Sequence, residues 1–183
     1  MKTQKSRNWL IILFSLTCLA SISTKPNRNG QQPREQTSFF VSPGGSGSAC
    51  SMATPCPLQT ALDNLNGGDI IYLASGTYQK ANPATEVILV DKSIQLYGGW
   101  NGQAGALIID PDLYISVIDG QDARRCIKVI AGGAGSKLSG LTLTNGFADP
   151  YGGGIYSSAS SLTITRIKFR DNISGSMGGG IFL

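Results

Sequence analysis

The sequence predicts an all-β fold, a single-stranded parallel β-helix in which short strands stack coil upon coil. The main observation is a repeat: Gly152-Gly153-Gly154-Ile155 recurs as Gly178-Gly179-Gly180-Ile181, a spacing of 26 residues. The same step maps Leu138 onto Ile164 and Leu143 onto Phe169, so apolar positions lie above their counterparts one coil later. A fixed period of about 20 to 50 residues is typical of solenoids.

Within each copy the apolar residues alternate as they do in strands. Every second residue is apolar in 162–164 and again in 167–169, but the phase slips at Thr165-Arg166. Neighbouring side chains of a strand point to opposite faces, so the slip predicts a corner between two short strands. Gly140 occupies the matching corner of the previous copy.

One helix is expected near the start of the fold. A strand at 39–41 is followed by a turn, and then by Leu58, Ala61, Leu62 and Leu65, which make one apolar stripe on a helix over 58–65. Residues 66–68 end it. Such a helix protects the open edge of a first coil, so we expect an amino-terminal cap at 39–68 and coils at 69–183.

The remaining strands are expected to alternate with turns. They are predicted at Ile70–Leu73, Val87–Val90, Ile94–Tyr97, Leu107–Ile109, Tyr114–Ile118, Ile127–Ile130, Leu138–Thr144, Ile155–Tyr156, Leu162–Phe169 and Ile181–Leu183. The last of these lies inside a rung with no polar or helical cap after it. We therefore expect an incomplete solenoid, truncated at its carboxyl end, that self-associates through the uncapped coil.

Residues 1–23 are predicted to be an export signal. Lys2, Lys5 and Arg7 precede an apolar run at 9–16, and small residues follow, so cleavage is expected after Ala20 or Ser23. The alternatives are an uncleaved anchor, for which the run is too short to span a membrane stably, and a lipoprotein acylated at Cys18. Residues 24–38 are polar and are predicted to be a disordered linker.

Composition excludes several functions. The 183 residues include no histidine, which removes a His-based triad or zinc site. Without the signal, 12 basic residues face 11 acidic ones, so nothing indicates a nucleic-acid partner. An oxidising compartment favours a disulfide between Cys50 and Cys56, whereas Cys126 lies on an alternating stretch and is expected in the core.

Two segments resemble known families. Phe39–Gly45, Cys56–Leu62 and Gly67–Tyr78 are similar to the amino-terminal cap and first coil of bacterial β-helix proteins of the pectate-lyase-like superfamily. That resemblance implies a right-handed helix. Phe169-Arg170-Asp171-Asn172 followed by the second glycine triplet resembles the FxxN and GGA[ILV] repeats of polymorphic outer membrane proteins, which are surface adhesins and autotransporter passengers.

Three sets of residues are candidates for a functional role. Asn145 and Asn172 suit turns, or ladders in which an amide bonds to a like residue one coil away. Polysaccharide lyases of the resembled fold use carboxylates that hold calcium and a basic residue, and hydrolases use groups of aspartates. The one local cluster of that kind is Asp119, Asp122, Arg124 and Arg125, although a solvated corner explains it better.

Aromatic residues give the better binding site. Tyr72 precedes Tyr97 by 25 residues, nearly one coil, and Trp100 follows closely, so their rings are candidates for a row that stacks on sugars. Core packing or contact with the cap is the alternative role for these rings.

The leading hypothesis is an exported bacterial protein, secreted or at the cell surface, that contacts carbohydrate or a host-surface ligand without catalysis. It needs no metal or cofactor, and no stable membrane span after signal cleavage. The alternative is the front part of a polysaccharide lyase or glycoside hydrolase, with calcium as its cofactor, whose active coils lie beyond the chain. A third reading is a structural stalk.

Overall fold

The computed structural model describes residues 35–81 and 84–183. The predicted export signal at 1–23 and the linker up to residue 34 lie outside the described residues. The account that follows concerns the compact unit Gln36–Leu183.

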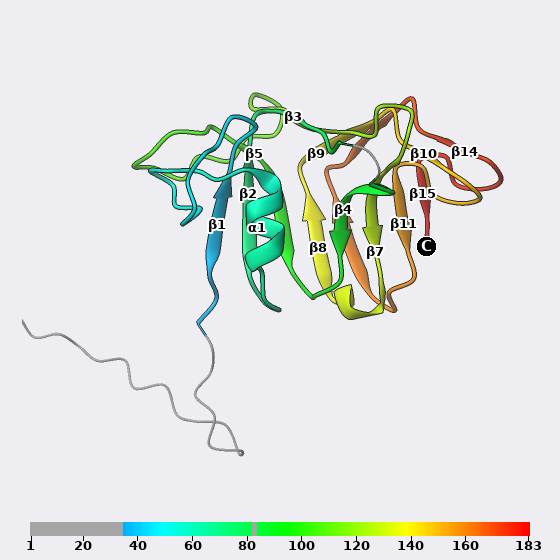
Figure 1. Ribbon diagram of the computed structural model, residues 1–183, viewed down its shortest axis with the longest axis horizontal. Coiled ribbons are helices and arrows are strands. Elements are labelled where there is room, and N and C mark those ends of the chain that lie inside the picture. The colour runs from blue at the N-terminus through cyan, green and yellow to red at the C-terminus, as the bar shows by residue number, and fades with distance from the viewer. Residues whose placement is uncertain (1–34, 82–83) are drawn as a thin grey trace, which may run out of the picture. The chain divides into compact units, whose positions relative to one another are not determined.

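Three parallel sheets run side by side along this unit, and successive coils contribute one strand to each (Figure 1). The first sheet contains β1 (Ser38–Val41), β2 (Ile70–Ala74), β5 (Gln95–Trp100), β8 (Ser136–Ser139) and β12 (Leu162–Thr165). The second contains β3 (Gly76–Tyr78), β6 (Ser116–Asp119), β9 (Leu141–Thr144) and β13 (Lys168–Arg170). The third contains β4 (Glu86–Val90), β7 (Arg125–Val129), β11 (Ile155–Ser157) and β15 (Ile181–Phe182).

The helical content of the described chain is small. The helix α1 (Leu58–Asn64) lies alongside β1 and β2, and Leu58 and Leu62 pack against the buried core (Figure 1). A single 3-10 turn, η1 (Ala131–Gly133), and the short pair β10 (Phe147–Ala148) and β14 (Ile173–Ser174) complete the elements. With all the paired strands in parallel register, the unit is a parallel β-helix, as the sequence predicts.

The 26-residue register of the sequence is the register of the last two coils of the structure. Leu138 pairs with Ile164, and Ile155 pairs with Ile181, each one coil later. Inward-facing residues of the middle coils are fully buried, whereas Ile164 and Ile181 in the last coil are only partly covered. The apolar repeat therefore forms one continuous core along the solenoid. Its largest fully buried aliphatic side chains are Ile71, Leu73, Ile88, Ile94, Leu96, Ile118, Ile127, Leu138, Leu141, Leu143 and Ile155.

The predicted corner between the first and second sheets is confirmed. The backbone of Gly140 has a φ of 70°, and Arg166 at the equivalent position has a φ of 53°. The amide of Gly140 donates to the carbonyl of Thr165 at 3.2 Å, which joins the two corners. Left-handed backbone is what divides the predicted strands Leu138–Thr144 and Leu162–Phe169 into two each.

The ordered unit begins earlier than predicted. Thr37 donates its amide to the buried carboxylate of Asp69 at 3.0 Å, and Asn66 donates to the second oxygen at 2.8 Å. Asp69 thus ties the entering chain to the end of α1. For this reason residues 36–38, which the sequence assigned to the linker, belong to the fold.

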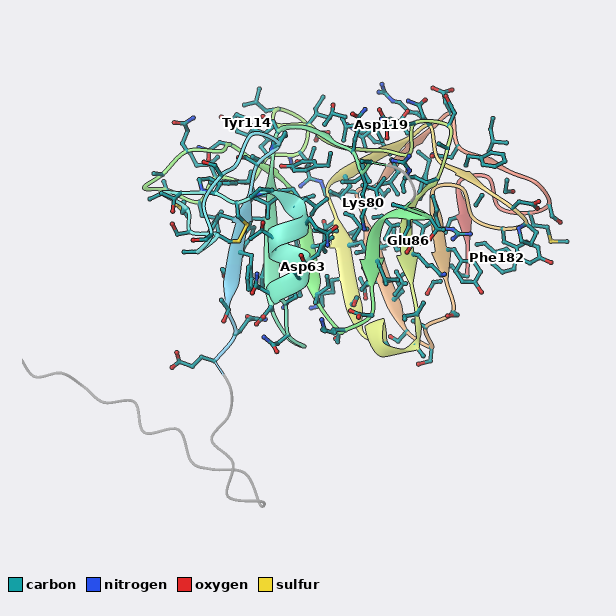
Figure 2. All side chains as sticks on the ribbon, viewed as in Figure 1. Asp63, Lys80, Glu86, Tyr114, Asp119 and Phe182 are labelled. Carbon is teal, nitrogen blue, oxygen red and sulfur yellow. A yellow bond between two sulfur atoms is a disulfide. The ribbon has the colours of Figure 1, made fainter. Side chains whose placement is uncertain are left out.

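The disulfide prediction is also confirmed. Cys50 and Cys56 are joined, and the bond lies beside α1 (Figure 2). Cys126 has a free thiol and is fully buried between coils, where its Sγ lies 3.4 Å from the carbonyl oxygen of Thr144. Burial raises the pKa of the Cys126 thiol to about 12, so it stays protonated.

Candidate carbohydrate-contact site

An aromatic row crosses the outer face of the first sheet. Phe40 pairs with Tyr72, and Tyr72 pairs with Tyr97, so β1, β2 and β5 present one ring each in register. The residues that precede the two tyrosines on their strands, Ile71 and Leu96, are fully buried. The alternation of strand side chains therefore puts these rings outside the coil and the aliphatic residues inside.

The three rings stack on one another, and no ring follows Tyr97, the last of them. The centroids of Phe40 and Tyr72 lie 5.3 Å apart with planes inclined by 22°, and those of Tyr72 and Tyr97 lie 5.8 Å apart at 20°. Tyr72 is therefore held between two rings. Partial burial, with the neighbouring Tyr97 as a second cause, raises the pKa of its phenol. Tyr97 has a ring on one side only, since the next residue of the row is Ser139 on β8.

Polar side chains lie beside Tyr97. Its hydroxyl donates to Oε1 of Gln95 at 2.8 Å, which fixes the amide and leaves its N–H groups for another acceptor. Beyond the ring, Thr165 Oγ1 donates to Ser139 Oγ at 3.0 Å. Lys137 is paired in register with Gln95 and is exposed. The outer face thus changes from aromatic to hydroxylated within one coil.

A shallow hollow of about 370 Å³ lies over the row, and Leu107 and Ile109 form a wall beside Tyr72 and Tyr97. The sequence predicted a strand at Leu107–Ile109, and that prediction is wrong. These residues belong to an irregular segment, 101–115, which joins β5 to β6, and Ile109 makes only an isolated antiparallel bridge to Trp100. Their side chains are 38% to 48% exposed because they cover the outside of the sheet rather than the interior.

The structure removes Trp100 from the predicted sugar-stacking row. Its side chain is fully buried, and its ring meets Phe40 edge-on with centroids 5.1 Å apart. The register between β2 and β5 shifts after the pair Tyr72 and Tyr97. As a result, Trp100 is paired with Ala74. Because the ring of Trp100 is fully buried, no ligand can stack on it.

The carboxylate of Asp119, at the end of β6 (Figure 2), accepts three hydrogen bonds. It accepts from Nε2 of Gln79 at 2.7 Å, from the amide of Gln121 at 2.9 Å and from Nδ2 of Asn145 at 3.1 Å. Partial burial by itself would raise the pKa of Asp119, but these bonds and the charge of Arg124 hold it below the usual value. Such a carboxylate is poorly suited to general acid or base chemistry near neutral pH.

Of the other members of the candidate acid/base cluster, Asp122 is exposed and has a left-handed backbone, and the two arginines face different neighbours. Arg124 is buried, and its Nη1 donates to Oε1 of Gln121 at 2.7 Å. Arg125 donates from Nε to the carbonyl of Gly152 at 2.8 Å and from Nη2 to the carbonyl of Tyr151. The two arginines line one hollow, whose carboxylate is Asp149 rather than Asp119 or Asp122. The hollow that contains the two arginines therefore contains neither carboxylate of the cluster.

The two predicted asparagines occupy turns, but not as partners of like residues. Asn145 has a φ of 49° and donates to Asp119 one coil earlier. Asn172 accepts from the amide of Gly146 at 2.8 Å and donates to the carbonyl of Leu143 at 2.9 Å. In the coil register Asn145 corresponds to Asp171, which has the same left-handed backbone. This offset explains why the amides do not stack on each other.

The model of a family described as "Protein of unknown function (DUF1565)" matches residues 46–183, about three quarters of the chain. The chain belongs to the DUF1565 family. Proteins of this family are associated with β-helices of the pectate-lyase-like kind, which agrees with the coils described above. No curated protein and no solved structure matches the chain.

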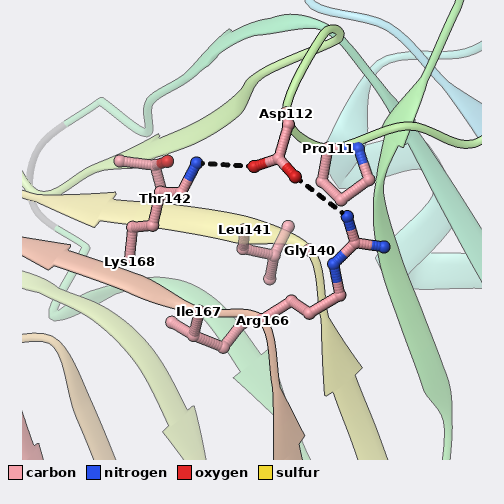
Figure 3. A pocket seen from close by; sticks show the side chains of 8 residues that line it. All are labelled: Pro111, Asp112, Gly140, Leu141, Thr142, Arg166, Ile167 and Lys168. Atoms are coloured by element: carbon pink, nitrogen blue, oxygen red, sulfur yellow. Dashed lines mark hydrogen bonds and ion pairs between the residues drawn. The ribbon is translucent and has the colours of Figure 1, made fainter.

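In this DUF1565 chain a further hollow, of about 280 Å³, lies where the 101–115 segment crosses the last two coils (Figure 3). Asp112 accepts from Nζ of Lys168 at 2.9 Å and from Nη2 of Arg166 at 3.2 Å. The hydrogen bond and charge of Lys168, and then those of Arg166, lower the pKa of Asp112. These exposed ion pairs fasten the segment to β13, and sequence reasoning missed them because the partners lie 54 and 56 residues apart.

Sequence reasoning also missed a second aromatic cluster, on the third sheet of the DUF1565 chain. The rings of Tyr151 and Phe182 stack with centroids 4.5 Å apart, and Tyr156 lies 5.9 Å from Phe182. Arg125 lies over Tyr156 at 5.0 Å from the ring centroid. The 26-residue step between Tyr156 and Phe182 could have revealed the pair. Tyr151 and Tyr156 also line a hollow of about 450 Å³ together with Arg125, Lys128 and Asp149.

Across 35–81 and 84–183, no group of three or more His, Cys, Asp or Glu side chains is placed to hold a metal ion. Within the same residues, no helix has the length and apolar character needed to cross a membrane.

Proposed function

We propose that this chain is a non-catalytic carbohydrate-contact module of an exported bacterial protein, acting at the cell surface or after secretion. The observation that carries the proposal is the hollow that Tyr72 and Tyr97 line together with Leu107 and Ile109. Export rests on residues 1–23, whose composition is that of a signal peptide. The adhesin-like repeat near residue 172 supports a surface role in the same way.

The chemistry of a sugar matches this surface. A pyranose ring has an apolar C–H face, which packs on an aromatic ring, and hydroxyl groups at its rim, which need donors and acceptors. Tyr97 supplies the ring, and Gln95 supplies a fixed amide beside it. Ser139 adds a hydroxyl one coil further along. A ligand stacked on Tyr97 therefore meets both kinds of partner without movement of the backbone.

The geometry favours contact over catalysis. A lyase or hydrolase needs an acid, a base or a metal-bound carboxylate beside the sugar. Among the described residues, the paired side chains Gln95 and Lys137 lie two positions before Tyr97 and Ser139 on β5 and β8, and neither is a carboxylate. Asp119, the best carboxylate of the predicted cluster, belongs to the second sheet and is engaged by three donors. The alternative, the front part of a polysaccharide lyase or hydrolase, draws on the resemblance alone.

Affinity electrophoresis with soluble glucans, xylans, chitosan and pectins tests the proposal. We expect at least one polysaccharide to retard the chain, and Tyr97→Ala to weaken binding about tenfold, the loss expected for about 1.4 kcal/mol of stacking and apolar contact. Tyr114→Ala is the matched control, because Tyr114 is a half-buried tyrosine on the 101–115 segment that does not line the hollow.

Circular dichroism of both variants shows whether each is folded. The proposal is wrong if no polysaccharide binds, or if Tyr97→Ala binds as well as the unchanged chain. Release of unsaturated uronides or reducing sugar in the same mixtures would favour the enzyme alternative, and Asp119→Asn would then be the first variant to assay.

A further inference from the structure

We propose that Asn66 is a site of spontaneous covalent modification, and that its conversion to aspartate and isoaspartate loosens the place where the chain enters the fold. Asparagine is one of the chemically labile residues of proteins. It is most reactive before glycine, because a residue without a β-carbon lets its backbone nitrogen approach the side chain that precedes it. The inference is independent of the carbohydrate contact proposed above.

The reaction takes two steps. The backbone nitrogen of the glycine loses its proton to solvent base and attacks Cγ of the asparagine, the Cγ–Nδ2 bond breaks, and ammonia leaves with a proton from water. Water then opens the resulting succinimide ring at one of its two carbonyls, which gives aspartate or isoaspartate. Solvent supplies every other reactant, so the surroundings of each asparagine determine how fast it reacts.

Asn-Gly occurs four times in the chain, so the sequence alone offers four candidates. Asn29-Gly30 lies outside the described residues, and the other pairs are Asn66-Gly67, Asn101-Gly102 and Asn145-Gly146. Among these three pairs, Asn66-Gly67 has the most open surroundings. Both of its residues are exposed, and a β-carbon built on Gly67 would meet no atom within 4 Å.

Neither the attacking nitrogen nor the leaving amide is held firmly at Asn66-Gly67. Among the described residues, the amide of Gly67 donates no hydrogen bond. Within the same part of the chain, Nδ2 of Asn66 donates only a long bond, to the carbonyl of Asn64 at 3.4 Å. The side chain can therefore rotate toward the Gly67 nitrogen without breaking a strong interaction.

Asn145-Gly146 is protected from the same reaction. The amide of Gly146 donates to Oδ1 of Asn172 at 2.8 Å, and Nδ2 of Asn145 donates to Oδ1 of Asp119 at 3.1 Å. Gly146 is buried, and a β-carbon built there would collide with the backbone of Gly153. Ring closure would break both hydrogen bonds and needs space that the neighbouring coil fills.

Asn101-Gly102 lies between these two cases. Both residues are half-buried, and Oδ1 of Asn101 accepts from the amide of Gln103 at 3.2 Å. The amide of Asn101 donates to the carbonyl of Ile108 at 3.1 Å. These bonds restrict the rotation of the Asn101 side chain, so we expect it to react more slowly than Asn66.

Conversion of Asn66 acts on the turn that ties the entering chain to the fold. The amide of Asn66 donates to the buried carboxylate of Asp69 at 2.8 Å, and its carbonyl accepts from the amide of Asp69 at 3.2 Å. The same carboxylate accepts from the amide of Thr37, and Nε2 of Gln36 donates to the carbonyl of Gly68. Isoaspartate lengthens the main chain in this turn by one carbon and puts a free carboxylate in place of the Asn66 carbonyl. The ties to residues 36 and 37 should therefore weaken.

Ageing of the folded chain at mildly alkaline pH, followed by digestion and mass spectrometry, tests the choice of site. Each conversion replaces an amide by a carboxyl group and raises the mass of its peptide, and chromatography separates aspartate from isoaspartate. We expect Asn66 to convert first, Asn101 more slowly and Asn145 not at all over the same time. In urea all three should convert at similar rates, because the reacting pair is the same.

Two variants separate the effect on the entering chain from other effects of ageing. Gly67→Ala adds a β-carbon in open space, so the chain should fold, but conversion of Asn66 should be lost. Asn66→Asp carries the new charge without the longer main chain. Cleavage within residues 35–38 by a broad-specificity protease should become faster in the aged unchanged chain and stay the same in aged Gly67→Ala.

The results decide both parts of the proposal. Equal conversion of the three asparagines in the folded chain, or faster conversion of Asn145 than of Asn66, would show that Asn66 is not the selected site. Conversion of Asn66 without faster cleavage of 35–38 would show that the entering chain is not loosened. If unaged Asn66→Asp is cleaved as fast as the aged chain, the charge rather than the longer main chain is responsible, and the loosening by conversion stands.

Discussion

Truncating one inward leucine of a middle coil tests the stacking of the core. Leu138 is fully buried and lies in register between Leu96 of the coil before and Ile164 of the coil after. Leu138→Ala removes three carbon atoms, worth about 2.5 kcal/mol at ~0.8 kcal/mol for each buried carbon. Neighbours held in a strand register cannot close the space, so a cavity term brings the expected loss to about 3 to 4 kcal/mol.

Ile164→Ala is the matched comparison because it removes a side chain of the same column from the last coil. Ile164 is only partly buried, so its truncation should cost about 1 kcal/mol and leave little cavity. Urea unfolding followed by circular dichroism measures both variants. Equal losses for the two substitutions would contradict the argument, since they would mean that coil position does not determine burial.

Four further predictions follow from the cap, the core and the last coil. Replacing Cys50 and Cys56 by serine should lower the free energy of unfolding by about 2 kcal/mol, measured by urea titration, because the closed loop is short. Since burial raises the pKa of Cys126 from 9.0 to about 12, the folded chain keeps a proton that the unfolded chain releases, and stability should fall as pH rises above 9. Cys126→Ala should flatten that fall in unfolding experiments between pH 8 and 11. Gly140→Ala should cost about 2 kcal/mol in the same urea assay, because φ is 70° and an added β-carbon would lie 3.0 Å from Cβ of Pro111. The chain should self-associate in light scattering through the partly covered last coil, and Ile167→Lys should make it monomeric; unchanged association in that variant would place the contact elsewhere.

The fold was predictable because each coil of a solenoid repeats the same short pattern of strands and corners. A 26-residue step, alternation within strands and a phase slip at the corner are all visible in one chain, and neighbouring coils are neighbours in sequence. The disulfide and the buried Cys126 followed from equally local patterns. These features needed no knowledge of contacts between distant residues.

The candidate site was only partly predictable. Tyr72 and Tyr97 were found from their near-coil spacing, and the structure stacks them. Trp100 was misassigned because its ring, although it contacts the outward Phe40, is fully buried, and coil spacing carries no information about what covers a ring. The wall at Leu107 and Ile109 was missed because a short apolar run predicts a buried strand equally well.

The sequence by itself determined the β-helix, its coil length, its corners, its capping helix and its disulfide, because each arises from residues that are close in the chain or one repeat apart. Only the tertiary structure decided which aromatic ring ends the stacked row and which carboxylate is already engaged. Tyr97 ends the row because the next coil brings Ser139 rather than another ring, and Asp119 is engaged because Gln79 and Asn145 meet it from other coils. Exposure and hydrogen-bond partners depend on contacts across coils, which no local pattern specifies.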